Sequence, residues 1–589
     1  MFKRQDKGNL DLDNVDQSNI PKFFKLNTGV RIEINDEVFR DVELCECFSE
    51  SRSVADEITD FSTFKETNPY VHEILSHPIQ DKATLNKRQR YLQKLPYDAA
   101  SNHLKNIKDK LSSVKWLLTS KESEIEGVLD GVYFQWWLFR NANTSSYMIT
   151  LTNIYSILLS PTIGVLSPVV YVLLPYFVMR YKYKIEIPFK LYIRTLYIAS
   201  TTSLQSDGGN FLQIASYFSF ASTIGFYLHG TLQSLDHSKQ SYNICRLIHD
   251  HAKNILSIYR EYQSAMTCSM LEINPFFDFG ERVNMKCIDE DFSLYIMDDQ
   301  SFILSNFGKY LKLYKSLNTE ENKDRLRKLM NHMFILDALC SIKKCIVNKN
   351  LTKCSYNFSS QRPYIVYKDS RHICLSNDSV ANTFDNSKRV KKNTILTGPN
   401  ASGKSTFIKG VLINILLSQT IAYNATSESI ATPFDYIGSQ INIPDCKGKE
   451  SLFEAEMYRC KNNFDYMKNN QDKKCILFMD ELFNSTNFVE GMSGAYSILA
   501  HMSALKNSML FVTTHYPQLT KLHENYNYDL QKFDCEKVNG KITYNYNLVP
   551  GICDKYVALD ILQEHGYDTG IIDLANEVKE SIISQFLLL

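Results

Sequence analysis

Glycine and proline are scarce in this sequence, with 22 and 15 residues among 589, and no internal repeat is visible. This scarcity argues against architectures built from turn-rich repeats. The 14 cysteines are scattered and form no C-x-x-C pair, so the ligand spacing of a structural zinc site is missing. The net charge is zero, because Lys plus Arg and Asp plus Glu number 65 each. The charge of the whole chain therefore does not indicate a nucleic-acid partner.

A secretory signal is also absent from the first residues, since Met1 to Asp6 are mostly polar. Together with the unpatterned cysteines, this favours a reducing, intracellular compartment. Hydrophobic residues make up 44% and charged residues 22%, close to the globular average, which excludes a wholly disordered or collagen-like chain. The length predicts about three to four domains.

The middle of the chain lacks charge over two stretches. No Asp, Glu, Lys or Arg occurs in residues 141–179, although a bilayer span needs only about 20 apolar residues. Ser-Pro pairs at 160–161 and 167–168 predict a kinked or broken helical hairpin, and the basic residues of 180–194 are typical of the cytoplasmic side. The run 208–235 is diluted by polar residues, so a span and a buried or interfacial helix fit equally. A buried helical core of a soluble protein is the alternative for both runs.

A phosphate-binding loop is predicted near residue 400. The sequence reads as a strand over 392–396 and as a helix from Gly403, and the segment between them fits G-x-x-x-x-G-K-[ST]. In such a loop the main-chain N–H groups face phosphates, the lysine reaches the β- and γ-phosphates and the hydroxyl binds Mg²⁺. The expected nucleotide-binding residues are Gly398, Pro399, Asn400, Ala401, Ser402, Gly403, Lys404, Ser405 and Thr406.

Two later strands are expected to deliver catalytic groups to the same sheet edge. The apolar run 476–479 ends at Asp480 and Glu481, where one carboxylate can serve Mg²⁺ and the next can orient the attacking water. The segment "SMLFVTTHY" ends near His515, which we expect to sense the γ-phosphate, although a structural histidine is the alternative.

These segments together resemble the MutS family. "TGPNASGKST", "GKESLFEAEM", "MDELFNSTNFVEG" and "VTTHYPQL" follow one another in the family's order, over a region of residues 360–585. The resemblance implies an α/β ABC-like P-loop ATPase domain, preceded by an all-α core and lever domain that a hydrophobic helical insert interrupts. The chain resembles short MutS-like proteins with such an insert, as in large DNA viruses and some bacteria.

The resemblance also implies a division into five parts. They are an N-terminal extension (1–64), the first part of the helical core domain (65–140), the hydrophobic and membrane-associated insert (141–235), the second part of the core and lever domain (236–355), and the ATPase domain (356–589).

Family resemblance further implies a homodimeric ATPase that uses ATP and Mg²⁺. Two nucleotide sites lie at a head-to-head interface of the ATPase domains, and Ser451 of one subunit caps the nucleotide of the other. Within one subunit Lys404 holds phosphates, Ser405 and Asp480 serve Mg²⁺, Glu481 positions water and His515 reads the γ-phosphate. ATP binding and hydrolysis then move the helical levers.

Departures from the family pattern leave two functions open. Phe48-Ser49-Glu50 fits the mismatch-reading Phe-x-Glu, but its surroundings do not match, and the insert stands where a DNA clamp is normal. The family's Gly-Arg-Gly-Thr is replaced by residues 483–486. One function is a DNA-binding mismatch-repair ATPase, soluble and nuclear or cytoplasmic. The other is a membrane-anchored mechanochemical ATPase without mismatch recognition, with its ATPase domain on the cytoplasmic side. An inactive dimer is disfavoured because every hydrolytic position is filled.

Overall fold

The computed structural model divides the chain into two compact units. Unit 1 comprises residues 1–105, 264–282 and 330–589, and unit 2 comprises residues 106–263 and 283–329. Phe48-Ser49-Glu50 lies outside the residues that the structure describes. Those residues are 25–27, 32–35, 37–47, 52–119, 142–202, 210–270, 273–278, 282–285, 307–443, 451–538, 541–553, 555 and 557–586, without some side chains within 168–241, 538–541 and 582–586. The five-part division expected from the sequence stays a prediction.

A seven-stranded sheet organises the C-terminal part of unit 1. Its order is β14-β13-β7-β12-β11-β10-β2, and all neighbours are parallel except β13 and β14. Because parallel strands are covered on both faces, the central strands are continuous buried runs. The strands are β2 (Glu33–Ile34), β7 (Asn393–Thr397), β10 (Tyr436–Gln440), β11 (Cys475–Asp480), β12 (Ser508–Thr513), β13 (Tyr528–Val538) and β14 (Lys541–Pro550).

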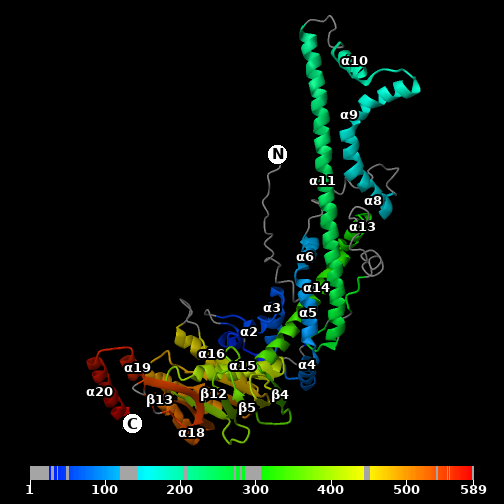
Figure 1. Cartoon of the computed structure of the whole chain (residues 1–589). Coiled ribbons are helices and arrows are strands. Elements are labelled where there is room, and N and C mark those ends of the chain that lie inside the picture. Colours follow the sequence, from blue (N-terminus) through cyan, green and yellow to red (C-terminus); the bar gives the residue numbers. More distant parts are fainter. Residues whose placement is uncertain are drawn as a thin grey trace. The chain divides into compact units, whose positions relative to one another are not determined.

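Three helices connect and cover these strands (Figure 1). Helix α15 (Lys404–Thr420) packs on β11 and β12, α16 (Leu452–Asn469) packs on β10, and α17 (Phe488–Ser503) packs on β12. The predicted strand–loop–helix around residue 400 is confirmed by β7 and α15, and the predicted strands before Asp480 and His515 are β11 and β12. The C-terminal part is therefore an α/β domain of the P-loop ATPase type, within a chain that is otherwise largely helical.

A second sheet and two helices complete this part of the chain. The sheet has the order β6-β5-β9-β4-β8. Its strands are β4 (Thr352–Tyr356), β5 (Ile365–Ser370), β6 (Asn382–Asp385), β8 (Tyr423–Asn424) and β9 (Glu428–Ala431), and helices α19 (Ala558–Glu564) and α20 (Thr569–Phe586) follow β14. Residues 539–540 fall outside the described residues, and β13 and β14 on either side of them pair antiparallel, as in a hairpin.

The N-terminal segment is built into the same unit. Strand β2 forms the edge of the seven-stranded sheet beside β10, and α1 (Glu37–Asp41) follows it. Strand β1 (Lys25–Leu26) pairs with β3 (Phe277–Asp278). Helices α2 (Val54–Thr59), α3 (Asn68–Leu75) and α4 (Lys82–Lys94) come next, while α5 (Tyr97–Lys108), α11 (Asn210–Ser269) and α14 (Glu320–Asn348) contribute residues to both units.

Unit 2 contains the hydrophobic insert. Its helices are α6 (Leu111–Thr119), α8 (Ser146–Ile154), α9 (Ser160–Phe177), α10 (Phe189–Thr202), most of α11, and α13 (Phe307–Leu317). Residues Ser146–Ser167 form one helical stretch that is long and apolar enough to cross a membrane, with 28% of that window buried. In the same unit, Trp116 of α6 stacks on His251 of α11, with ring centroids 4.2 Å apart.

Of the kink or break predicted at the Ser-Pro pairs, the break is not found. Helix continues from α8 through a π-helical turn at Tyr155–Leu159 into α9, and a second π-helical turn at Val178–Lys182 ends it. Proline is tolerated in the first turn of a helix, and Pro161 lies there in α9. A π-helical turn precedes the first pair, the second Ser-Pro pair lies within α9, and the helix continues through both pairs without the break that a hairpin requires.

Candidate active site

The loop between β7 and α15 has the backbone conformation of an anion cradle. Gly403, immediately before α15, has φ +100°, and Ala401 has φ +62°. A Cβ on Gly398 would lie 2.8 Å from Ser402 Oγ and 2.9 Å from the Phe533 carbonyl oxygen, so only glycine fits there. Ser402 Oγ is buried and has no hydrogen-bond partner among the described residues. A helix N-terminus beneath such a loop suits phosphate groups.

Lys404 lies inside this cradle and is buried. Its Nζ donates to the Gly398 carbonyl at 2.8 Å and to the Pro399 carbonyl at 3.0 Å, and it lies 3.4 Å from His515 Nε2. Burial lowers the pKa of Lys404, and the nearby Glu481 and Asp480 carboxylates partly oppose that shift. Neutral carbonyls compensate a buried ammonium less well than an anion does, so the site favours an anionic ligand.

The ends of β11 and β12 deliver a carboxylate pair. The register pairs Asp480 with Thr513, and Thr513 Oγ1 donates to Asp480 Oδ1 while accepting from the Glu481 N–H at 3.1 Å. Thr513 thus fixes the turn that separates the two carboxylates. Sequence reasoning noted Thr513 only as part of its strand and gave it no role.

Glu481 is held by two side chains. His515 Nε2 lies 2.5 Å from Glu481 Oε1, and Asn484 Nδ2 donates to Glu481 Oε2 at 3.0 Å. The His515 hydrogen bond is the main cause that lowers the pKa of Glu481, against the opposing effect of burial. A carboxylate kept ionised in this way can accept a hydrogen bond from water.

The predicted magnesium ligands, Ser405 and Asp480, suit an ion that is held jointly by protein and phosphate oxygens. They are too few for a site built from protein ligands alone. Ser405 follows Lys404 in the first turn of α15, and Asp480 ends β11. The described parts of the chain contain no group of three or more His, Cys, Asp or Glu side chains that could hold a metal by themselves. Mg²⁺ usually binds through one or two protein ligands together with phosphate oxygens and water, which is the donor set available here.

Ser451 occupies the N-cap of α16. Its Oγ accepts from the Glu454 N–H at 3.2 Å, and the Ser451 N–H donates to Glu454 Oε2 at 3.0 Å, which completes a capping box. Residues 444–450, which include the start of "GKESLFEAEM", lie outside the described residues. No hydrogen bond joins Ser451 to Lys404, Asp480, Glu481 or His515 in the part of the chain that the structure describes. Its predicted role in a partner's site stays a prediction.

Tyr546 of β14, which was not among the residues predicted from the sequence, lies beside the loop between β7 and α15. Its φ is +55°, its side chain is exposed, and its ring Cδ1 lies 3.3 Å from where a Cβ on Gly403 would be. Asn382 fixes this kink: Nδ2 donates to the Tyr546 carbonyl at 3.0 Å, and Oδ1 accepts from the Leu548 N–H at 2.7 Å. An exposed ring beside a phosphate loop can stack on a nucleotide base. No local sequence signal marks Tyr546.

Comparisons with known proteins agree with this geometry. The profile of MutS domain V matches residues 394–583, so this C-terminal part belongs to the MutS family. The DNA mismatch repair protein MutS of Clostridium botulinum (strain Loch Maree / Type A3) is 27% identical over 282 residues, which cover 45% of this chain and 28% of that protein. The DNA mismatch repair protein MSH3 of Candida albicans is 28% identical over 341 residues, which cover 54% of this chain and 30% of that protein. The chain thus matches less than a third of the length of these relatives.

Proposed function

We propose that this chain, whose residues 394–583 form a MutS domain V, binds ATP with Mg²⁺ and hydrolyses the nucleotide. The observation that carries the proposal is the convergence of Lys404, Asp480, Glu481 and His515, which come from three neighbouring strand ends, beside an anion cradle. Charge stabilisation and positioning are what phosphoryl transfer needs from a protein, and these side chains supply both.

Each side chain has a separate task in this mechanism. Lys404 and the loop N–H groups hold the β- and γ-phosphates, and Ser405 and Asp480 hold Mg²⁺, which neutralises phosphate charge when bound. Glu481 accepts a hydrogen bond from the attacking water and orients it. His515 keeps Glu481 ionised and stands ready to read the γ-phosphate, while Tyr546 stacks on the base.

We also infer a homodimer through the ATPase domains. The support is indirect: Ser451 is an exposed N-cap at the start of α16, and the dipole at a helix N-terminus suits a phosphate. In the dimer Ser451 completes the partner's nucleotide site, ATP binding closes the interface and hydrolysis opens it. The long helices α11 and α14, which contribute residues to both units, carry that motion as levers.

The ATPase is tested by comparing two glutamate variants. Glu481→Gln removes the ionised acceptor and is expected to bind ATP with little change while hydrolysing it at least about 100-fold more slowly. Glu490→Gln, an exposed first-turn residue of α17, is the control and should match wild type. Nucleotide binding is measured with a fluorescent ATP analogue and turnover by phosphate release. Equal turnover in Glu481→Gln and wild type would remove Glu481 from this role.

Two settings for this ATPase follow from different observations. The relatives named as DNA mismatch repair proteins favour a DNA-linked role in repair. The exposed apolar side chains of unit 2 favour anchoring in a membrane, without mismatch recognition. On α8, α9 and the turn between them they include Tyr147, Met148, Leu151, Tyr155, Leu158, Leu159, Ile163, Val165, Leu166, Val170, Val172, Leu174 and Phe177, each at least 40% exposed.

The polar side chains of this stretch are compatible with lipid. Thr150, Thr152 and Thr162 each donate to a main-chain carbonyl one turn earlier, at 2.8–2.9 Å. Such internal hydrogen bonds satisfy hydroxyl groups where no water is available. The basic residues of 180–194 follow at the end of the stretch, where anionic headgroups would meet them.

Alkaline extraction of membranes separates these settings. The full chain in the pellet, with a variant lacking 141–235 in the supernatant, would support anchoring. A soluble full chain would count against it, and DNA binding that weakens steeply with salt would then support the repair setting. Heteroduplex and homoduplex DNA should be compared in the same series, because only a preference for heteroduplex indicates mismatch recognition.

A further inference from the structure

The loop that follows Glu481 has an unusual backbone. Phe483 has φ +61° and Glu481 has φ +53°, a region that bulky L-residues rarely adopt. Such conformations persist only where the surroundings impose them, and they cluster at sites where the strain has a use. Phe483 is nevertheless almost fully buried, at 3% exposure.

Several groups impose this conformation on Phe483. The Tyr516 hydroxyl donates to its carbonyl oxygen at 2.9 Å. A Cβ on Gly491 would come within 2.5 Å of that oxygen, and one on Gly494 would touch the ring at 3.4 Å, so both glycines of α17 leave room for Phe483. Phe483 therefore holds the loop between Tyr516, which follows β12, and the glycines of α17.

The ring of Phe483 also contacts α16. Phe453, two residues after the Ser451 cap, meets it edge-on with ring centroids 5.6 Å apart and an interplanar angle of 65°. One turn further on, burial raises the pKa of Glu456, while the nearby Ser485 side chain and the Phe483 main chain oppose that shift. The first two turns of α16 thus rest on residues 483–485, directly after Glu481.

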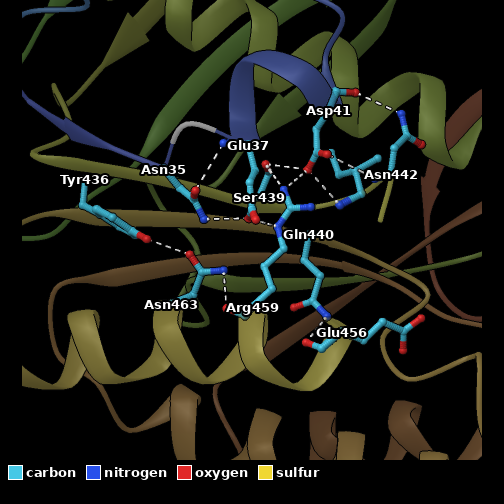
Figure 2. A network of polar contacts seen from close by, with 11 residues as sticks. Asn35, Glu37, Asp41, Tyr436, Ser439, Gln440, Asn442, Glu456, Arg459 and Asn463 are labelled. Carbon is cyan, nitrogen blue, oxygen red and sulfur yellow. Dashed lines mark hydrogen bonds and ion pairs between the residues drawn. The ribbon is translucent and has the colours of Figure 1, made fainter. Parts of the chain in front are cut away.

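The middle of α16 is held in place by polar contacts of Arg459 and Asn463. Figure 2 shows Arg459, in the third turn of α16, bound to Asp41 and Glu37 of α1. Asn463 accepts a hydrogen bond from the Tyr436 hydroxyl of β10 at 2.6 Å. Because the middle of α16 is held in place, a displacement of its N-terminus at Ser451 would move Phe453 against Phe483.

We propose that Phe483 is a positioning residue that couples α16 to Glu481, so that engagement of Ser451 by a partner's nucleotide sets the hydrolytic geometry in its own subunit. The proposal rests on the proposed ATPase and its dimer and adds a regulatory link between the two sites. Because Phe483 belongs to a buried core cluster and Phe453 packs against that cluster, their contact is expected to change the rate of the chemical step and to leave nucleotide affinity unchanged.

The test is a double-substitution cycle in the full chain. Phe453→Ala and Phe483→Leu are each expected to lower kcat roughly three- to tenfold, as the loss of one aromatic pair predicts, with KM for ATP unchanged. The double variant should be no slower than the slower single variant, since both remove one contact. Phe453→Tyr keeps the ring and should keep the wild-type rate. Tyr458→Ala, an exposed aromatic of the same helix, is the control.

A second measurement does not depend on turnover. Hydrogen exchange of residues 480–486 should speed up in Phe453→Ala and stay unchanged in Tyr458→Ala. Unchanged kcat and unchanged exchange in Phe453→Ala, or single effects that multiply in the double variant, would overturn the coupling. If Phe453→Ala yields no folded protein, Phe453→Leu serves in its place. A wild-type chain that hydrolyses no ATP would overturn the proposed function instead, and exchange alone would then decide the Phe453–Phe483 link.

Discussion

The buried ion pair between α1 and α16 offers a sharp test of the structure. Asp41 is fully buried and Arg459 is 5% exposed, although they are far apart in the sequence. Asp41 Oδ2 accepts from Ser439 Oγ at 2.7 Å and from the Ile441 N–H at 3.0 Å, while Oδ1 accepts from the Asn442 N–H at 3.3 Å. The two carboxylate oxygens thus serve separate main-chain donors as well as the Arg459 guanidinium (Figure 2).

Asp41→Asn keeps the shape of the side chain but removes its charge and one acceptor. Removing one partner of a buried ion pair typically lowers the free energy of unfolding by about 3–5 kcal/mol. The penalty for leaving a buried donor without an acceptor, about 1–3 kcal/mol, is part of this loss. Glu37 stays 2.5 Å from Arg459 Nε and is partly exposed, so it compensates some of the loss. We therefore expect the lower end, about 3 kcal/mol, which is about a 100-fold increase in local opening.

Native-state hydrogen exchange measures this directly, because a chain with two units need not unfold in one step. Exchange at residues 436–443 should accelerate about 100-fold in Asp41→Asn. The exposed pair Lys368–Glu428 supplies the control, since Glu428→Gln should change nothing measurable. A double variant, Asp41→Leu with Arg459→Met, should recover much of the loss because no charge stays buried. Equal exchange in Asp41→Asn and wild type would refute the reasoning.

Three further predictions concern the candidate active site. Gly398→Ala should abolish nucleotide binding, because its Cβ would lie under 3 Å from Ser402 and Phe533; a titration with a fluorescent ATP analogue checks this, and tight binding would contradict the loop geometry. Tyr546→Ala should raise KM for ATP several-fold at unchanged kcat, with Tyr546→Phe as control, because stacking on the base is worth about 1–3 kcal/mol. The Glu481–His515 pair should add to stability above about pH 4.5 and lose that effect as pH falls through the lowered pKa of Glu481. Melting temperatures of wild type and Glu481→Gln should therefore converge below that pH, and a constant difference down to pH 3 would argue against the pair.

Much of the arrangement of the candidate site could be predicted because its signals are local. The glycines and lysine near residue 400 and the apolar strands ending at Asp480 and near His515 occur in short windows, and parallel strands bring their ends to one edge. Sequence spacing could not predict the left-handed backbone of Phe483, since nothing in its neighbours requires φ above zero. Tyr546 was missed for the same reason, because a kink imposed by Asn382 is a tertiary effect.

Longer-range features were out of reach for a different reason. The contact of Asp41 with Arg459 joins residues 418 positions apart in the chain, and neither residue belongs to a recognisable motif. The Ser-Pro pairs predicted a kink or a break, but the helix continues through both pairs, with a π-helical turn before the first. In both cases the outcome depends on which segments pack together, and the periodicity of one segment does not contain that information.

The position of β2 predicts how the seven-stranded sheet would behave in a fragment that lacks the N-terminal segment. This strand covers the outer edge of β10, and Arg459 finds its counter-charges only in the helix that follows β2. A fragment starting at β4 would present the bare N–H and C=O groups of β10 together with an unneutralised buried guanidinium. Uncovered edge strands recruit other strands, so such a fragment should self-associate, whereas adding residues 25–47 in trans should restore a monodisperse species.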